Sequence, residues 1–393
     1  MEGAHLFEPL DELISAAGVS GSEGPVAAVV AAQLAAGDIA ADRLERDALG
    51  NRWLCFDGRQ AGAPSATRVM EGGLGDPPHR EGGRPWPPER GAQGRAPSQR
   101  ILAAHMDEIG LRITSIREDG ICRVQAVGGI DPQLWEGTEV QVHTAGGIVP
   151  ACIAPVSLHV TQRMGLGPTQ RLKAEDLYLD LGAGSAQAVA ALGVRMLDSV
   201  TWIKGLTELS GGLVQGRSLD DRFGCLALVE LAKLLHAAPP PVPTVVTWTV
   251  QEEVGLRGAR ALAQRFLNAS EVIAVDSFTV GLGPRDNRQF DSVRLGDGPA
   301  LRAWDATTLL PDGAREAVLA AAAGAGIPLQ YGHMPGGNDA SVWEASAAAQ
   351  GGPGARVYGL GIPVQYSHSN VERAHLGDLA ALVRLLAGIC DSE

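Results

Sequence analysis

The second half of this chain alternates apolar strand-like runs with helical segments, and this alternation restricts the fold more than any other feature. The helical patterns lie at 221–236, 256–266, 312–325 and 375–389. The apolar runs lie at 244–250, 272–275, 328–331 and 357–360. Strands that alternate with helices usually form a mostly parallel sheet covered by helices on both faces. The predicted fold class is therefore α/β, with a mixed, mostly parallel sheet between helices.

The first part of the chain adds further elements to this body. Residues 8–36 have helical patterning that is interrupted at 18–23, and strand-like runs follow near 42–45 and 51–56. Residues 57–100 are dense in glycine, proline and arginine. A segment of this composition buries too little apolar surface to order itself, which predicts a disordered surface loop.

The middle of the chain has a different sequence pattern. Between residues 110 and 202, short β-like runs are broken by glycine, and helical patterning is sparse apart from 185–192. This pattern predicts a small β-barrel-like domain at 112–204, inserted into the α/β body. The body itself is then discontinuous and consists of residues 1–111 and 205–393.

Composition excludes several classes of partner. The 393 residues carry a formal net charge of −13, which argues against nucleic acid and anionic membranes as partners. The sequence shows neither a signal-peptide pattern nor an apolar stretch long enough to span a bilayer. Its five cysteines are scattered and lack any CxxC pair, which is typical of reduced thiols and favours a cytoplasmic setting.

Two acidic doublets, Asp220-Asp221 and Glu252-Glu253, lie at boundaries between apolar runs and helix-like segments. Adjacent carboxylates repel each other and are costly to bury, so a fold rarely buries two such pairs without cations. His105, Asp276 and His368 also follow strand patterns or lie in loops, where open α/β sheets place their sites. A hydrolase with two metal ions is the first hypothesis.

Each of these residues also has a structural interpretation. One Asp suffices to cap a helix, so the second carboxylate at 220–221 needs another reason, such as bridging two metals. Asp276 alone could be a helix cap, and His368 alone could be an exposed loop residue. Asp107 lies two residues after His105 and could accept a hydrogen bond from its free ring nitrogen.

Neighbouring residues of a strand point to opposite sides, and the strand pattern at 244–250 stops just before Glu252 and Glu253. One of these carboxylates could therefore bind metal while the other takes a proton from water.

Seven segments together resemble the M42 family of metallo-aminopeptidases, which includes glutamyl and leucyl aminopeptidases and the tetrahedral TET particles. The segments are AAHMDEIGLRI, KAEDLYLDLGA, SLDDRFGCLALVEL, VTWTVQEEVGLRGARALA, AVDSFTVG, PGGNDA and QYSHSNVE. They occur in the order of the family and are spread along the chain between residues 103 and 372, outside residues 57–100. Two departures are the length of that stretch and Asn338, which stands where the family has Thr and could alter how the substrate backbone is held.

The resemblance implies two divalent metal ions, usually zinc, with cobalt or manganese as alternatives. It also implies a role for each candidate residue: His105 and Asp276 at one metal, Glu253 and His368 at the other, Asp220 bridging, Glu252 as general base, Asp107 orienting His105, and Asp221 supporting the turn. The inserted domain at 112–204 would serve dimer contacts and substrate access. Dimers of this family can assemble into dodecamers.

The predicted function is removal of N-terminal residues from short peptides, with a metal-activated water as nucleophile and Glu252 as its base. A related binuclear deacylase or carboxypeptidase would use the same metals on different amides. An endoglucanase-type glycosidase would need two carboxylates but neither histidine. A non-catalytic scaffold is the third class, although all the expected ligands and the base are present.

Overall fold

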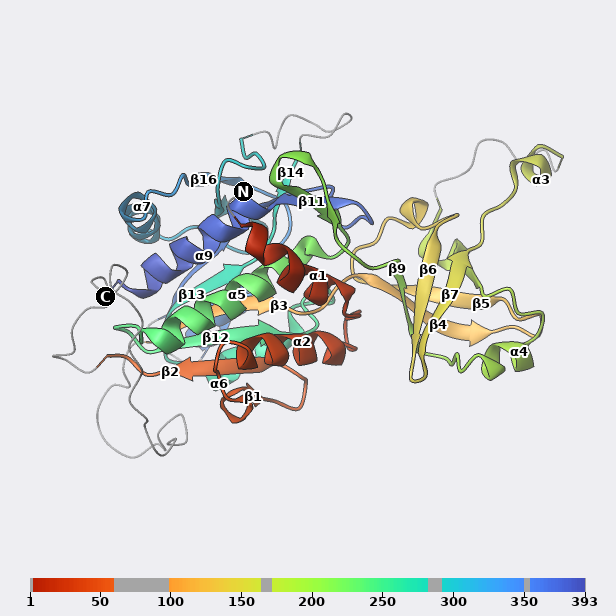
Figure 1. Ribbon diagram of the computed structural model, residues 1–393, viewed down its shortest axis with the longest axis horizontal. Helices are drawn as coiled ribbons and strands as arrows, with labels where there is room; N and C mark the ends of the chain where they lie inside the picture. Colours follow the sequence, from red (N-terminus) through yellow and green to blue (C-terminus); the bar gives the residue numbers. More distant parts are fainter. Residues whose placement is uncertain (1–2, 60–98, 164–171, 282–291, 350–353, 393) are drawn as a thin grey trace.

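The computed structural model describes residues 3–59, 99–163, 172–281, 292–349 and 354–392. Most of the stretch 57–100, for which the sequence predicts a disordered loop, lies outside these residues. Figure 1 shows an α/β body that contains both ends of the chain, with a smaller β unit projecting from one side.

An eight-stranded mixed sheet forms the centre of the body. In spatial order its strands are β1 (Glu45–Arg46), β2 (Arg52–Phe56), β12 (Thr244–Thr249), β3 (Gln99–His105), β13 (Ala269–Val275), β17 (Arg356–Gly361), β15 (Ala300–Trp304) and β16 (Gln330–His333). The inner strands β12, β3, β13 and β17 run parallel, as do β15 and β16. Every residue of β3 and β12 is buried, which explains their continuous apolar sequences. The predicted fold class is confirmed.

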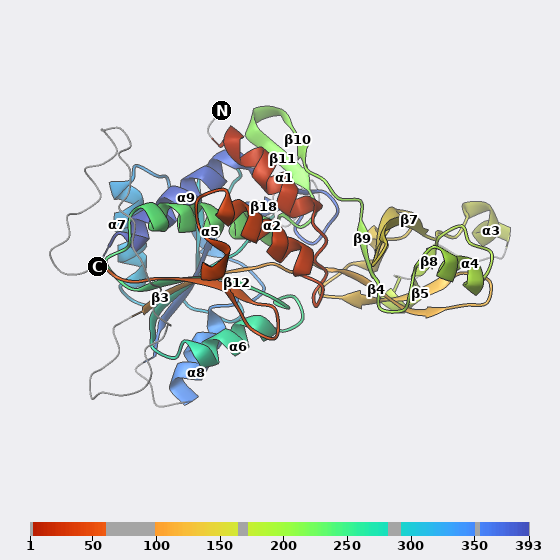
Figure 2. The ribbon, with the colours of Figure 1, turned by 60° about the horizontal axis from the view of Figure 1, so that its bottom comes forward.

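Helices cover both faces of this sheet (Figure 2). On one face lie α1 (Phe7–Ser15), α2 (Gly24–Ala35), α5 (Leu219–Ala237), α7 (Ala314–Gly324) and α9 (Leu376–Cys390). The other face carries α6 (Arg257–Arg265) and α8 (Ser341–Ala349). Each face has its own apolar core, and α5 is buried along most of its length because it packs between the sheet and α1, α2 and α9.

A second, five-stranded sheet lies beside the first and was not predicted from the sequence. Its order is β10 (Thr207–Glu208), β11 (Leu213–Gly216), β19 (Glu372–His375), β18 (Pro363–Gln365) and β14 (Phe278–Val280). Strands of two to four residues are too short to show an alternating pattern. Similarly, the strand expected near 42–45 is mostly a 3-10 turn at Ala41–Arg43, and only Glu45–Arg46 pair as a strand.

The projecting unit is a closed six-stranded barrel, as the sequence predicts. Around the barrel run β4 (Gly110–Ile116), β5 (Cys122–Val127), β8 (Tyr178–Asp180), β7 (Gly147–Ile153), β6 (Glu139–Thr144) and β9 (Ser199–Trp202), with α3 (Leu158–Arg163) and α4 (Ala186–Ala191) outside. The barrel has a separate core, in which Trp135 stacks on Trp202 with ring centroids 3.8 Å apart. Its role in dimer contacts stays a prediction.

Among the described residues, no helix has both the length and the apolar character that crossing a bilayer requires. All five cysteines are free, and Cys122, Cys225 and Cys390 are buried. The five cysteines therefore form no disulfide bond, as their scattered positions in the sequence predict.

Two chain connections join the barrel to the body, and a buried ion cluster ties them together. Glu108 in the first connection receives Lys204 from the second, with Nζ 3.0 Å from Oε1. The same carboxylate contacts Arg217, and the Nη2 atom of Arg222 lies 3.3 Å from Oε1. The backbone N–H of Gly18 also donates to it, at 2.7 Å. Glu108 therefore contacts three basic side chains where the chain enters and leaves the barrel.

We expect Glu108→Ala to lower the free energy of unfolding by about 3–5 kcal/mol, because three buried basic side chains lose the carboxylate that they contact. Denaturant unfolding followed by tryptophan fluorescence measures this change. Glu175→Ala removes an exposed carboxylate from the barrel and should unfold like the parent protein. Equal midpoints for the two variants would show that the cluster contributes nothing to stability.

Candidate metal centre

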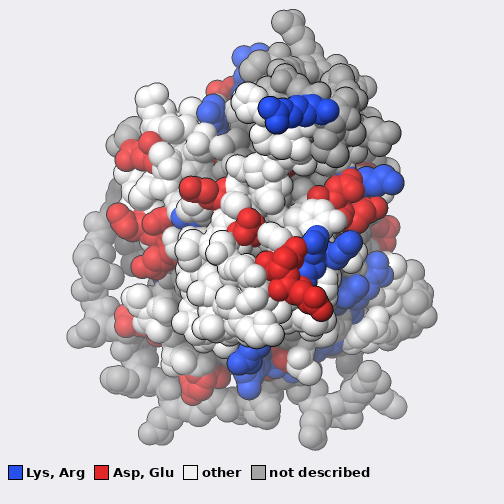
Figure 3. All heavy atoms as spheres, turned by 90° about the vertical axis from the view of Figure 1, so that its right-hand side faces the viewer, with Lys and Arg blue, Asp and Glu red and all other residues white. Residues whose placement is uncertain are grey.

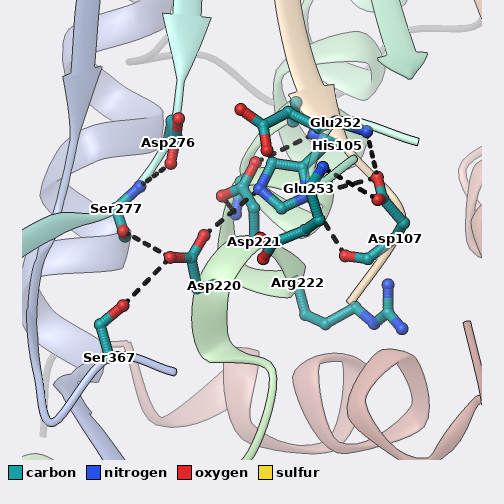
Figure 4. A network of polar contacts seen from close by, with 12 residues as sticks. His105, Asp107, Asp220, Asp221, Arg222, Glu252, Glu253, Asp276, Ser277 and Ser367 are labelled. Carbon is teal, nitrogen blue, oxygen red and sulfur yellow. Dashed lines mark hydrogen bonds and ion pairs between the residues drawn. The ribbon is translucent and has the colours of Figure 1, made fainter. Parts of the chain in front are cut away.

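The acidic and imidazole side chains identified from the sequence meet at one edge of the central sheet (Figure 4). His105 is the last residue of β3, and Asp276 follows β13, its parallel neighbour. Glu252 and Glu253 follow β12, on the other side of β3. Because the carboxyl ends of parallel strands meet at the same edge, these residues converge there.

His105, Asp220 and Asp276 form the inner part of the cluster. All three are buried, and each offers a ligand atom within 4.8 Å of the others. Nε2 of His105 lies 3.3 Å from Oδ1 of Asp220. This Oδ1 atom is buried and makes no hydrogen bond within the described part of the chain.

His368 and Glu253 form the outer part of the cluster. Nε2 of His368 lies 3.3 Å from Oε1 of Glu253 and 3.9 Å from Oδ2 of Asp220. Asp220 thus directs one oxygen towards His105 and the other towards His368. This is the arrangement that a carboxylate shared between two ions would require.

Asp107 is hydrogen-bonded to His105 and to the backbone of Glu252 and Glu253. Its carboxylate accepts hydrogen bonds from the Ser20 hydroxyl at 2.6 Å and from the backbone N–H groups of Glu252 and Glu253 at 2.9 and 3.1 Å. Nδ1 of His105 donates to the Asp107 carbonyl at 3.2 Å and lies 3.6 Å from Oδ1. The orienting bond is therefore made mainly by the main chain of Asp107, while its carboxylate holds the two glutamates.

The directions of Glu252 and Glu253 have a different cause from the one expected. Strand β12 ends at Thr249, so both glutamates lie beyond the strand, and the alternation of strand side chains does not apply to them. Gln251 has a φ of 56°, which turns the chain out of the strand direction. The hydrogen bonds to Asp107 then hold the turn in place.

The two members of the Asp doublet have different environments. Asp221 accepts hydrogen bonds from the backbone N–H groups of His105 at 3.1 Å and Gly224 at 3.2 Å. A side chain at Gly224 would collide with this carboxylate. The Asp220–Asp221 peptide bond is cis, and both residues have non-helical backbone angles at the start of α5. Both oxygens of Asp221 thus support the backbone, as the resemblance implies.

Three further residues of the site were not identified as functional from the sequence, although all three lie within segments that carry the family resemblance. Ser277 and Ser367 donate to Oδ2 of Asp220 at 2.8 and 3.3 Å. Glu372 accepts from the backbone N–H groups of Asp220 at 3.2 Å and His368 at 2.7 Å. These contacts join segments far apart in the sequence.

Arg302 also contacts the site, with Nη2 2.9 Å from Oδ1 of Asp276. A lone Arg within the apolar strand β15 is the one signal that could have marked it. Asn338 donates to Asp305 at 2.6 Å and to Thr308 at 3.1 Å, and it accepts from the backbone of Ala340 at 2.9 Å. Both the nitrogen and the oxygen of its side-chain amide are therefore hydrogen-bonded within the protein.

The electrostatics of the site favour a bound cation. Burial raises the pKa of Asp276 to about 6 although Arg302 opposes it, and burial raises the pKa of Glu252 well above its usual range. Burial alone would lower the pKa of each histidine, but the carboxylates beside them outweigh it. The pKa of His105 is therefore raised well above the usual value, and that of His368 is raised to about 10. Because these pKa values are raised, the acidic and imidazole groups of the metal-free site tend to bind protons, which a divalent ion would displace. Imidazole nitrogen and carboxylate oxygen together suit zinc, cobalt or manganese.

Comparisons with known proteins show which family this chain resembles in sequence and in fold. The family described as M42 glutamyl aminopeptidase matches residues 90–385. The glutamyl aminopeptidase of Lactococcus lactis subsp. cremoris is 30% identical over 295 residues, which cover 74% of this chain and 80% of that one. The lysyl aminopeptidase of Pyrococcus furiosus is 29% identical over 301 residues, covering 76% and 83%. In structure, the TET1 peptidase of Pyrococcus horikoshii superposes with a TM-score of 0.79 at 30% identity, covering 98% of this chain and 99% of that one.

Fold, site and comparisons define an aminopeptidase, a hydrolase that acts on peptide bonds. Within that class, the chain belongs to the M42 family. The resemblance found in the sequence is confirmed.

Proposed function

We propose that this chain is a binuclear metal-dependent aminopeptidase that removes N-terminal residues from short peptides. The observation that carries the proposal is the position of Asp220, whose two oxygens lie 3.3 Å from Nε2 of His105 and 3.9 Å from Nε2 of His368. A single buried carboxylate between two separate imidazoles is well suited to bridge two cations, because each of its oxygens faces a different nitrogen ligand.

In this proposal His105 and Asp276 would hold one ion, Glu253 and His368 would hold the other, and Asp220 would be shared between them. The ions would be zinc, with cobalt or manganese as alternatives. When bound, they would polarise the scissile carbonyl and lower the pKa of a water molecule.

Glu252 would act as the general base and general acid of the reaction. Its carboxyl is half-buried, and its burial raises its pKa, which suits a group that must both accept and return a proton. The bond from its backbone to Asp107 keeps the turn in place. Glu252 would take a proton from the attacking water and give one to the leaving amine.

We also propose that the chain forms homo-oligomers through the barrel. The Pyrococcus horikoshii TET1 peptidase is described as assembling into a tetrahedron or a large octahedral shell. Seen from the barrel side, the surface has a mostly uncharged centre with acidic and basic groups around it (Figure 3). Ile148, Val156 and Ile203 of the barrel region are more than half exposed, at 57%, 58% and 52%. These side chains fit a contact between copies.

A panel of aminoacyl-p-nitroanilides and short peptides, with and without zinc, cobalt or manganese, tests the activity. We expect hydrolysis only with metal and only when the substrate has a free α-amine, because the acidic site would hold that amine. N-acetylated versions of the same substrates are the matched control. Cleavage of acylated substrates would favour the deacylase, and a requirement for a free carboxylate would favour the carboxypeptidase.

A further inference from the structure

One hydrogen bond links the barrel to a candidate metal ligand. Gly129 belongs to the connection between the barrel strands β5 and β6, whereas His368 lies between β18 and β19 in the body. Nδ1 of His368 donates to the Gly129 carbonyl at 2.8 Å. The partner of this imidazole is therefore supplied by the barrel and not by the α/β body, which carries the other candidate ligands.

This bond determines which nitrogen of His368 can bind a metal. A carbonyl oxygen only accepts hydrogen bonds, so Nδ1 must carry a proton. In the neutral ring the lone pair is then on Nε2, the atom that faces Glu253 and Asp220. Such a bond fixes ring orientation and increases the basicity of the ligating nitrogen.

The two imidazoles of the site differ in this respect. His105 is fully buried and finds its carbonyl partner on Asp107, two residues along the same segment. The His368 side chain is 36% exposed and has its backbone in the left-handed region at φ 62°. Less packing surrounds this ring, so its orientation depends more on the Gly129 bond.

Two glycines allow the barrel loop to approach the site. A Cβ at Gly129 would lie 3.2 Å from Nδ1 and 3.4 Å from Cε1 of His368. At Gly128, where φ is 80°, a Cβ would lie 2.7 Å from Cγ2 of Ile109 and 3.3 Å from Cβ of Glu253. The loop is thus packed directly against both residues of the outer metal position.

We propose that the barrel completes the metal centre, because the Gly129 carbonyl holds His368 in its ligating orientation. Gly129 is then a positioning residue for the ion at His368 and Glu253. The ion at His105 and Asp276 does not depend on it. This inference rests on the proposed function, since it assumes two ions.

The test is calorimetric titration of Zn²⁺ into the metal-free full-length chain. We expect Gly129→Ala to weaken one ion about 10–100-fold and to leave the other unchanged, because the added methyl displaces the ring. The matched control is Gly184→Ala, also in the barrel segment, where an added Cβ meets nothing within 4 Å. Neither glycine has a left-handed φ, so alanine fits the backbone at both positions.

A second measurement needs no variant at position 129. In the ¹¹³Cd-loaded chain with ¹⁵N-labelled histidine, the coupling from His368, assigned with His368→Gln, should appear at Nε2, with Nδ1 still protonated. Coupling at Nδ1 would overturn the inference.

The outcomes separate the two proposals. A parent protein that binds no Zn²⁺ would overturn both of them. Two ions in the parent and equal affinities in Gly129→Ala, or an equal loss at both positions, would overturn this inference alone.

Discussion

The Glu252→Gln protein should keep two divalent ions per chain while its kcat falls by about 10²–10⁴-fold, the usual contribution of a general acid–base. An amide has nearly the shape of the carboxyl but cannot accept the proton of the attacking water. The turn should survive, because its anchor is the backbone N–H of Glu252, which donates to Asp107 at 2.9 Å.

Steady-state kinetics on the preferred p-nitroanilide and metal analysis of the same sample measure both quantities. Glu253→Gln is the matched control, and it should lose affinity for one ion because this position is assigned as a ligand. If Glu252→Gln lost an ion, Glu252 would be a ligand. If it kept full activity, another group would have to move the proton.

His105→Ala and His368→Ala should each weaken a different ion, by at least roughly 100-fold, since even residues that only orient a ligand change affinity by about 10–100-fold. Nε2 of each ring faces a different oxygen of Asp220, so the two losses should be separable. Titration with Co²⁺, followed by its visible absorption, distinguishes the positions.

His5→Ala is the control for this experiment, because His5 is an exposed histidine remote in sequence from the site, and its titration should match that of the parent protein. A simultaneous loss of both ions in either single variant would contradict the assignment of the two histidines to separate positions.

The larger elements of the fold could be predicted because each has a strong local pattern. Helix α5 and strands β3, β12 and β13 are buried along most of their length. Their sequences are therefore apolar over long, uninterrupted stretches, which can be recognised locally. The five-stranded second sheet escaped prediction because its strands are short and pair through contacts distant in sequence, such as β11 with β19.

In the candidate site, too, some residues could be predicted from the sequence and others could not. The side chains proposed to bind ions are acidic or imidazole groups at the ends of strand patterns, and that chemistry is visible in the sequence. Glu372 lies within the segment QYSHSNVE, but its contacts could not be predicted because it accepts hydrogen bonds from backbone N–H groups. The Gly129 carbonyl could not be predicted either, because it is itself backbone. Their roles depend on tertiary contacts between segments that no local pattern connects.

The chain leaves the body for the barrel and returns to it at nearly one point, where Glu108 and Lys204 are in contact. A segment with adjacent ends can be exchanged for another during evolution without altering the order of strands in the body. If the Gly129 bond acts as proposed, any replacement would still have to present a carbonyl to His368. We therefore expect related chains to diverge freely over most of the barrel while the loop that follows β5 keeps its backbone path.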